Sequence, residues 1–229
     1  MFIDYITLLL INMAAGFVVL ACFFMVGLNS PNRRVWAPAF AAVGAVAFAA
    51  GLHMTLTWPV NAPGLRFANV AFGEMSVLLG VLFLGMALAA ARGWDPLPLS
   101  AYAIFAGLAA IIVGVAIRRF GLTATPRLTA AGFVLSGFAG VMAPIILLLR
   151  NRLAARAMMA LILIASAGVW SIIGYGSYWK HIRDFSSPGK AQPAATAPAA
   201  GSRPSSAPSG TTQPGSDMDS RLRREISGQ

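Results

Sequence analysis

Six long apolar runs set the class of structure that this chain can form. They cover roughly residues 5–28, 36–58, 66–91, 98–117, 128–149 and 153–179. A helix rises about 1.5 Å per residue, so about 20 apolar residues cross the hydrocarbon core of a bilayer. The runs therefore predict an all-α membrane protein, with a six-helix transmembrane bundle in residues 1–185.

The composition supports a lipid environment over an aqueous one. Only 10% of the 229 residues are charged and 58% are hydrophobic, whereas a soluble domain carries about a quarter charged residues. The formal net charge of +10 does not indicate a nucleic-acid partner, because the basic residues lie between the apolar runs, where they act as membrane-edge anchors. The expected partner is therefore the lipid bilayer, and no nucleic acid is expected.

The breaks between the runs are rich in residues that end helices or anchor a chain at the membrane surface. Pro59 and Pro63 separate the second run from the third, since proline cannot continue a helix. Large aromatic side chains at these edges are typical of an interfacial belt. The predicted anchors are Trp36, Trp58, Trp94, Tyr178 and Trp179.

The composition changes after Phe185 to a segment rich in Ser, Pro and Ala. Residues 186–229 cannot bury a core, so a disordered tail is predicted there. Near its end, Met218, Leu222 and Ile226 lie four residues apart beside several arginines, a spacing consistent with a short basic helix over 217–227. The alternative for this stretch is a frayed, solvated chain end.

The distribution of Lys and Arg says little about which side of the membrane each loop faces. Six spans put both termini on one side, and the Lys and Arg residues near the span ends number six on each side. Lys190 and the basic tip of the tail add charge to the side of the termini. We therefore expect a multi-pass protein of the inner, cytoplasmic membrane, with both termini cytoplasmic.

Polar residues inside the spans are the candidate functional groups. Glu74 is the one acid that the first 180 residues place within a span, ~12 Å from the membrane edge, and His53 lies ~8 Å from the same edge. An ionisable group at such depth is costly and often functional. The predicted intramembrane polar site consists of Asn12, His53, Thr57, Asn69 and Glu74.

Two functions of different classes account for this site. In the first, Glu74 and His53 bind and release a proton in a small proton-linked carrier or transporter, beside a cavity lined by Asn12 and Asn69. In the second, the polar groups are structural, and the protein is a non-catalytic membrane subunit or scaffold whose tail recruits a membrane-protein partner.

Enzyme and cofactor chemistry has little support in the sequence. The two histidines, His53 and His181, do not make a haem or zinc ligand set, and no nucleotide-binding or nucleophile motif occurs. No catalytic residue, metal ligand or cofactor is therefore predicted, and the sequence favours a protein that is not an enzyme.

Two short blocks resemble a known family. The block from His53 through Trp58 and Pro59, followed by the Asn-x-x-Phe-Gly-Glu block that ends at Glu74, resembles a family of prokaryotic multi-pass membrane proteins of unknown function. The resemblance covers about residues 1–185. It implies that the hairpin between the second and third helices is the characteristic site, and it implies no substrate.

Overall fold

The computed structural model describes residues 5–186, and six helices in this part are long and apolar enough to cross a membrane. No strand occurs among these described residues. The prediction of an all-α, six-span membrane protein is confirmed. The tail predicted over 186–229, apart from Ser186, lies outside the described residues, as does the helix predicted at 217–227. The six long helices are α1 (Tyr5–Cys22), α2 (Ala37–Thr57), α3 (Met75–Arg92), α4 (Leu97–Phe120), α5 (Pro126–Leu148) and α6 (Leu153–Phe185).

Three short turns of different helical pitch flank the long helices. The π-helical turn η1 (Phe23–Gly27) extends α1, and the 3-10 turn η2 (Arg33–Trp36) leads into α2. A second π-helical turn, η3 (Asn69–Glu74), leads into α3. With these turns included, the spans begin and end within a few residues of the apolar runs, except at the last helix. There α6 continues to Phe185, beyond the predicted 179, because Lys180 and Arg183 favour helix and no glycine or proline intervenes.

The helix ends follow from local sequence. Prolines lie in the first turns of α2, α4 and α5, where the missing N–H breaks no intrahelical hydrogen bond. Gly93 and Gly121 end α3 and α4 in the left-handed conformation. Trp58 ends α2 at φ 45°, an uncommon value for a residue with a side chain, and Pro59 prevents the helix from continuing.

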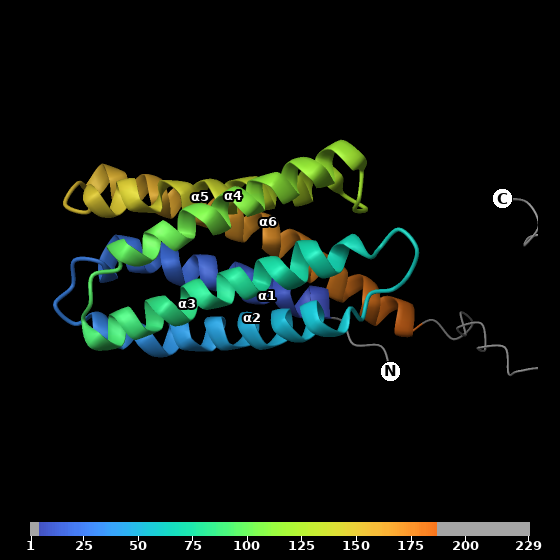
Figure 1. Ribbon diagram of the computed structural model, residues 1–229, viewed down its shortest axis with the longest axis horizontal. Helices are drawn as coiled ribbons and strands as arrows, with labels where there is room; N and C mark the ends of the chain where they lie inside the picture. The colour runs from blue at the N-terminus through green and yellow to red at the C-terminus, as the bar shows by residue number, and fades with distance from the viewer. Residues whose placement is uncertain (1–4, 187–229) are drawn as a thin grey trace, which may run out of the picture. The chain divides into compact units, whose positions relative to one another are not determined.

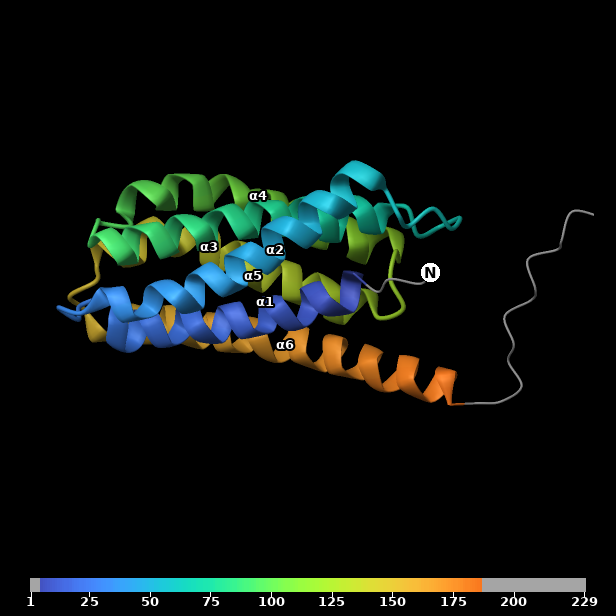
Figure 2. The ribbon, with the colours of Figure 1, turned by 90° about the horizontal axis from the view of Figure 1, so that it is seen from below.

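The helices close into a ring in the order of the chain. Each long helix packs against the next, and α6 returns to pack against α1. Figures 1 and 2 show neighbouring helices running in opposite directions, with the Tyr5 end of α1 and the Phe185 end of α6 at the same end of the bundle. α1 is the most buried span, because in addition to α2 and α6 it contacts α3, where Phe83 packs against Gly16.

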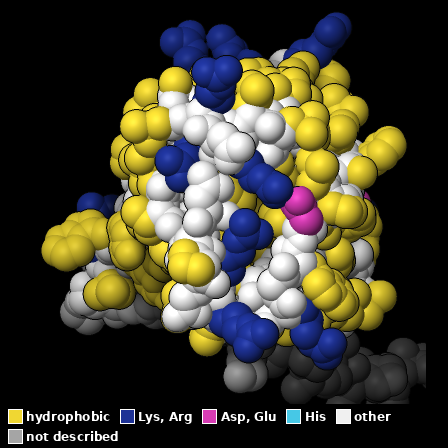
Figure 3. Space-filling view, turned by 90° about the vertical axis from the view of Figure 1, so that its left-hand side faces the viewer, with side chains coloured by type: hydrophobic (Ala, Val, Ile, Leu, Met, Phe, Trp, Pro, Cys, Tyr) yellow, Lys and Arg dark blue, Asp and Glu magenta, His cyan; other side chains and the backbone are white. Residues whose placement is uncertain are grey.

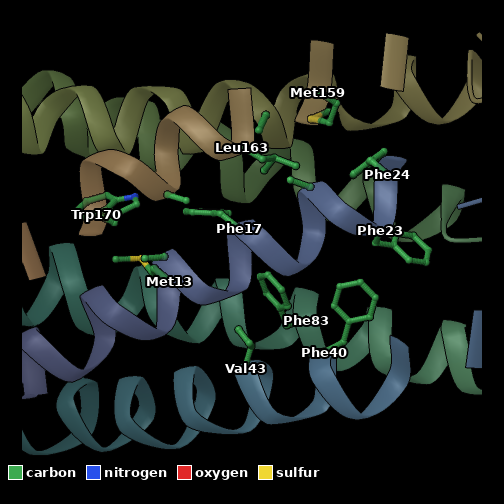
Figure 4. Close-up of a cluster of buried hydrophobic side chains, with 14 of the residues drawn as sticks. Met13, Phe17, Phe23, Phe24, Phe40, Val43, Phe83, Met159, Leu163 and Trp170 are labelled. Atoms are coloured by element: carbon green, nitrogen blue, oxygen red, sulfur yellow. The ribbon is translucent and has the colours of Figure 1, made fainter. Parts of the chain in front are cut away.

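Aromatic side chains form much of the core around α1 (Figure 4). Phe23 packs edge-on against Phe40, with ring centroids 5.2 Å apart, and Phe40 contacts Phe83 of α3. Further along the bundle, Phe133 of α5 packs edge-on against Trp170 of α6, with centroids 5.0 Å apart. These contacts link η1, α2 and α3 to one another, and α5 to α6.

The predicted interface anchors lie at helix ends. Trp58, Trp94, Tyr178 and Trp179 are all exposed in the bundle, as residues that meet lipid headgroups would be. Trp36 is half-buried instead, because its ring packs edge-on against Phe23 of η1. Trp36 therefore also ties η2 to the end of α1.

The end of the bundle opposite the termini is strongly basic (Figure 3). Asp95 lies there in the loop between α3 and α4, and its carboxylate pairs with Arg150 at 2.8 Å. The Leu97 N–H donates a hydrogen bond to Asp95, and this bond together with Arg150 holds the pKa of Asp95 below its usual range. The arginines in or near the loops of this end are Arg33, Arg34, Arg92, Arg150, Arg152 and Arg156.

Candidate functional site

Two cavities lie end to end between the helices of the ring. The first has a volume of about 110 Å³ and lies towards the arginine-rich end; the second has a volume of about 70 Å³ and lies towards the end of the termini. Helices α1, α3, α4, α5 and α6 contribute to both, whereas α2 contributes to neither. Six residues line both cavities and so form the wall where they meet: Phe17, Leu79, Leu82, Ala103, Ser136 and Gly140.

The lining of both cavities is almost wholly apolar, and it includes no charged side chain of the described chain. Ser100 and Ser136 are the polar side chains apart from the indole of Trp170. The hydroxyl of Ser100 donates to the carbonyl of Leu97 at 2.5 Å, and that of Ser136 donates to the carbonyl of Gly132 at 2.7 Å. Both hydroxyl protons are therefore used within their own helices.

Trp170 is fully buried beside the second cavity and is held by contacts from α5. Its indole N–H donates to the Ser136 hydroxyl at 3.0 Å. An added Cβ on Gly132 would lie 2.8 Å from the Trp170 ring, so the ring position requires a residue without a side chain there. Phe133 covers the ring edge-on, and Phe72 of η3 in turn contacts Phe133 with centroids 5.6 Å apart. An aromatic cluster thus packs at the end of the second cavity nearest the termini.

Two buried serine hydroxyls have no hydrogen-bond partner among residues 5–186. Ser166 of α6 is 0% exposed and Ser76 of α3 is 1% exposed. Ser76 packs against Gly51 in the contact between α2 and α3. Ser166 lies three residues after Leu163 and four before Trp170 on α6, but it lines neither cavity itself.

His53 lies on the outside of the bundle near the end of α2. Its ring stacks on Tyr5 of α1, with centroids 5.3 Å apart. The Thr57 hydroxyl donates to the His53 carbonyl at 2.8 Å and lies 3.3 Å from the imidazole Nδ1. His53 and Thr57, both predicted site residues, therefore do contact each other, at the exposed end of α2.

The two predicted asparagines bond to backbone groups. The Asn12 amide donates to the carbonyl of Val43 at 3.0 Å, and Val43 precedes His53 by ten residues on α2, or ~15 Å along the axis. Asn69 is 1% exposed, and its amide donates to the carbonyls of Val60 and Arg66 at 2.8 and 3.2 Å while accepting from the Val60 N–H. Asn69 therefore fixes the loop that joins α2 to η3.

Glu74 ends the π-helical turn η3 and is half-buried. Within the described residues it makes no hydrogen bond or ion pair with His53 or Asn12. Neighbouring residues explain this: Gly73 packs against Thr55, and Gly51 packs against Ser76, whereas His53 packs against Tyr5 of α1. The backbones of α2 and η3 approach closely, but the side chains of Glu74 and His53 are not hydrogen-bonded to each other.

The residues around the cavities differ from those that the sequence singled out. Sequence reasoning searched for ionisable and amide groups within the spans, and none of those five residues lines either cavity. The signal for the cavity wall is weaker: small residues recur four apart at Gly132, Ser136 and Gly140, of which Ser136 and Gly140 line the cavities and Gly132 packs against Trp170. Within residues 5–186, no group of three or more His, Cys, Asp or Glu side chains could hold a metal ion.

The fold and its cavities define an integral membrane protein, a ring of six helices with two cavities between five of them. Residues 1–184 match the family described as "Protein of unknown function (DUF981)", and the chain belongs to this family. No curated protein matches the chain.

A solved structure shares this fold. The cryo-EM structure of the Helicobacter pylori urea channel in its closed state superimposes with a TM-score of 0.62 at 15% sequence identity. The similarity covers 76% of this chain and 98% of the channel chain. At this identity the likeness concerns the fold.

Proposed function

We propose that the protein is a membrane passage for small uncharged solutes, which cross through the centre of the helix ring. The observation that carries the proposal is the pair of cavities between α1, α3, α4, α5 and α6, which meet at a common wall of six residues. The similarity of the fold to a urea channel supports it, because that protein passes a small neutral molecule within a related arrangement of helices.

The character of the lining restricts what could pass. An ion that entered the cavities would lose its hydration shell and meet no opposite charge among the residues that line them, which is costly in a medium of low dielectric constant. A small neutral molecule loses far less on leaving water. The lining therefore favours uncharged solutes of a few heavy atoms.

A proton-linked carrier that uses Glu74 and His53 is the second candidate function. One observation favours it: Met75, the residue next to the half-buried Glu74, lines the second cavity, so the backbone at Glu74 lies near the proposed path. If proton coupling occurs, replacing Glu74 with Gln should remove the pH dependence of transport while keeping the fold. Transport that does not depend on pH in the wild-type protein would leave the simple passage as the better description.

The proposed setting is the cytoplasmic membrane, with both chain termini on the cytoplasmic side. The start of the first span and the end of the last span lie at the same end of the bundle, as an even number of spans requires (Figure 1). The scaffold alternative, in which the tail binds a membrane-protein partner, predicts a bundle through which no solute passes.

Phe17 provides the test, because it is 4% exposed and lines both cavities where they meet. We expect vesicles that contain the purified wild-type protein to take up urea faster than protein-free vesicles, measured by light scattering after rapid mixing. Phe17→Ala should increase the rate several-fold, because it removes a large side chain from the common wall. Phe17→Leu, a smaller change, should give an intermediate rate and protects the test against a variant that does not fold.

The matched control is Phe105→Ala. Phe105 lies on α4 and is 74% exposed, so its removal should leave the urea rate unchanged. Vesicles in which the wild-type protein and both folded Phe17 variants pass no more urea than empty vesicles would contradict the proposal and favour the scaffold.

A further inference from the structure

The arginines at the end of the bundle opposite the termini are poorly balanced by acids. Figure 3 shows dark blue side chains of Lys and Arg spread over this face. Of its six arginines, Arg150 alone forms an ion pair within residues 5–186, with Asp95 at 2.8 Å. Asp95 is also the one acid in the three loops at this end. The six arginines and the single acid leave this face with a net charge of +5.

Polar contacts join the three loops of this face, so their backbones keep fixed relative positions. The amide of Asn29, in the loop between α1 and α2, donates to the Arg150 carbonyl at 3.1 Å. The Arg150 guanidinium in turn pairs with Asp95 in the loop between α3 and α4. Arg33 lies close enough to Asp95 to help lower the pKa of that carboxyl. The positive charges are therefore carried on one connected surface.

Arg156, in the first turn of α6, is a half-buried cation without a counter-ion among the described residues. Its Nη1 donates to the Met25 carbonyl of η1 at 3.3 Å, and its Nε is buried without a partner. Its Nη2 makes no hydrogen bond within residues 5–186 and is not fully enclosed, so an anion from outside can reach it. Arg152, four residues earlier at the N-cap of α6, is exposed.

Four of the arginines also lie at helix starts, where the positive end of the helix dipole disfavours a cation. Arg33 and Arg34 lie in η2, directly before α2. Arg152 and Arg156 lie at the start of α6. Neither start has an acidic residue in its first turn, whereas α4, which begins at the same end, has the Asp95 carboxylate there. A bound anion would supply the negative charge that α2 and α6 lack.

Phosphate is the anion that this face meets in a bilayer, because the loops that join the spans lie at the depth of the lipid headgroups. Trp94, exposed among the arginines, is typical of that depth. A guanidinium donates two parallel hydrogen bonds to a phosphate. The choline of a zwitterionic headgroup would bring a cation next to the arginines, whereas the glycerol of phosphatidylglycerol brings none. The charge of the face therefore favours anionic phospholipids.

We propose that the arginine-rich end of the bundle is a binding surface for the phosphate groups of anionic phospholipids, with Arg34, Arg152 and Arg156 as its main contacts. η1 packs against both η2 and α6, which brings the arginines of these two elements to neighbouring parts of the face. Bound lipid balances the charge at the starts of α2 and α6 and so stabilises the bundle. The surface is separate from the cavities, so it does not depend on which solute crosses the ring.

The double variant Arg34→Gln/Arg152→Gln tests the surface, because both side chains are exposed and neither makes a hydrogen bond or ion pair within the described chain. The unfolding temperature of the full-length protein in detergent is measured with increasing phosphatidylglycerol, or with phosphatidylcholine of the same acyl chains. We expect phosphatidylglycerol to raise the wild-type unfolding temperature more than phosphatidylcholine does. In the double variant the phosphatidylglycerol concentration that gives half of the shift should rise about tenfold.

The matched control is Arg118→Gln/Arg119→Gln, which removes the same charge at the other end of the bundle. Both residues are exposed and lie at the end of α4, where the helix dipole favours cations. We expect the control to keep the wild-type response to phosphatidylglycerol. The single variants Arg34→Gln and Arg152→Gln should each raise the half-shift concentration about threefold, and they keep the test decisive if the double variant does not fold.

Three results would overturn the proposal. Equal shifts with phosphatidylglycerol and phosphatidylcholine would show that the surface does not select anionic lipids. Equal weakening in the two double variants would show a general attraction of any basic membrane edge. A shift with inorganic phosphate as large as that with the same concentration of phosphatidylglycerol would show a site for free phosphate in place of a lipid surface.

Discussion

Asn69 makes more hydrogen bonds to the backbone than any other buried polar side chain described in the bundle. Its amide holds both polar groups of the Val60 backbone and the carbonyl of Arg66. These bonds hold the chain in the turn after Pro59, where the backbone has no helical partners of its own. Asn69 therefore determines the start of η3 and, through it, the position of Glu74.

Asn69→Ala should destabilise the protein by about 1–3 kcal/mol, because it leaves buried backbone groups unpaired. The measurement is thermal unfolding of the purified protein in detergent. Asn61→Ala is the matched control, since Asn61 is exposed in the same loop, and it should change the unfolding temperature little. Equal effects of the two substitutions would contradict the structural role assigned to Asn69.

Helix pairs in this bundle differ in how closely their backbones approach, and the closest approaches occur at glycines. α4 and α5 form the closest pair. An added Cβ on Gly107 would lie 2.5 Å from the Gly137 carbonyl, and one on Gly137 would meet the Gly107 carbonyl in turn. Neither backbone can yield without separating the helices, so this contact sets the distance between α4 and α5.

Gly137→Ala should therefore destabilise the bundle by about 1–3 kcal/mol, through a contact with backbone that cannot relax. Gly168→Ala on α6 is the control, because an added Cβ there meets no atom within 4 Å. It should be neutral or slightly stabilising, since alanine favours helix over glycine. Thermal unfolding in detergent compares the two, and a neutral Gly137→Ala would show that the helices can separate freely.

At the scale of the whole molecule, the bundle in residues 5–186 accounts for the packed core, and the segment from 187 onwards has a composition that cannot supply one. We propose that the bundle is the folded unit and that the Ser/Pro/Ala-rich tail makes no contribution to its stability.

Truncation after Pro188 should accordingly leave the unfolding temperature of the detergent-purified protein unchanged, and the shortened protein should still pass urea at the wild-type rate in vesicles. The full-length chain is the control. A clear drop in unfolding temperature would mean that the tail packs against the bundle, and a retained temperature with altered flux would give the tail a regulatory role.

The class of fold was determined by the sequence alone. Six runs of apolar residues must lie in lipid, prolines and glycines between them end helices through local backbone geometry, and arginines mark the membrane edges, so the number of spans and most of their limits follow from nearby residues. The last helix is longer than predicted, because apolarity marks where a helix leaves the membrane and not where its hydrogen bonds stop.

The arrangement of side chains around the ring was decided only by the tertiary structure. Sequence gives the depth of a residue along its own span, but the rotation and axial offset of each helix depend on close contacts with others, such as those at Gly51, Gly107 and Gly137. The contact of Gly16 with Val43 joins α1 to α2, where Asn12 lies opposite Val43 and His53 stacks on Tyr5. They also bring Phe17, Ser136 and Trp170 from three separate spans to one internal space, which no single span encodes.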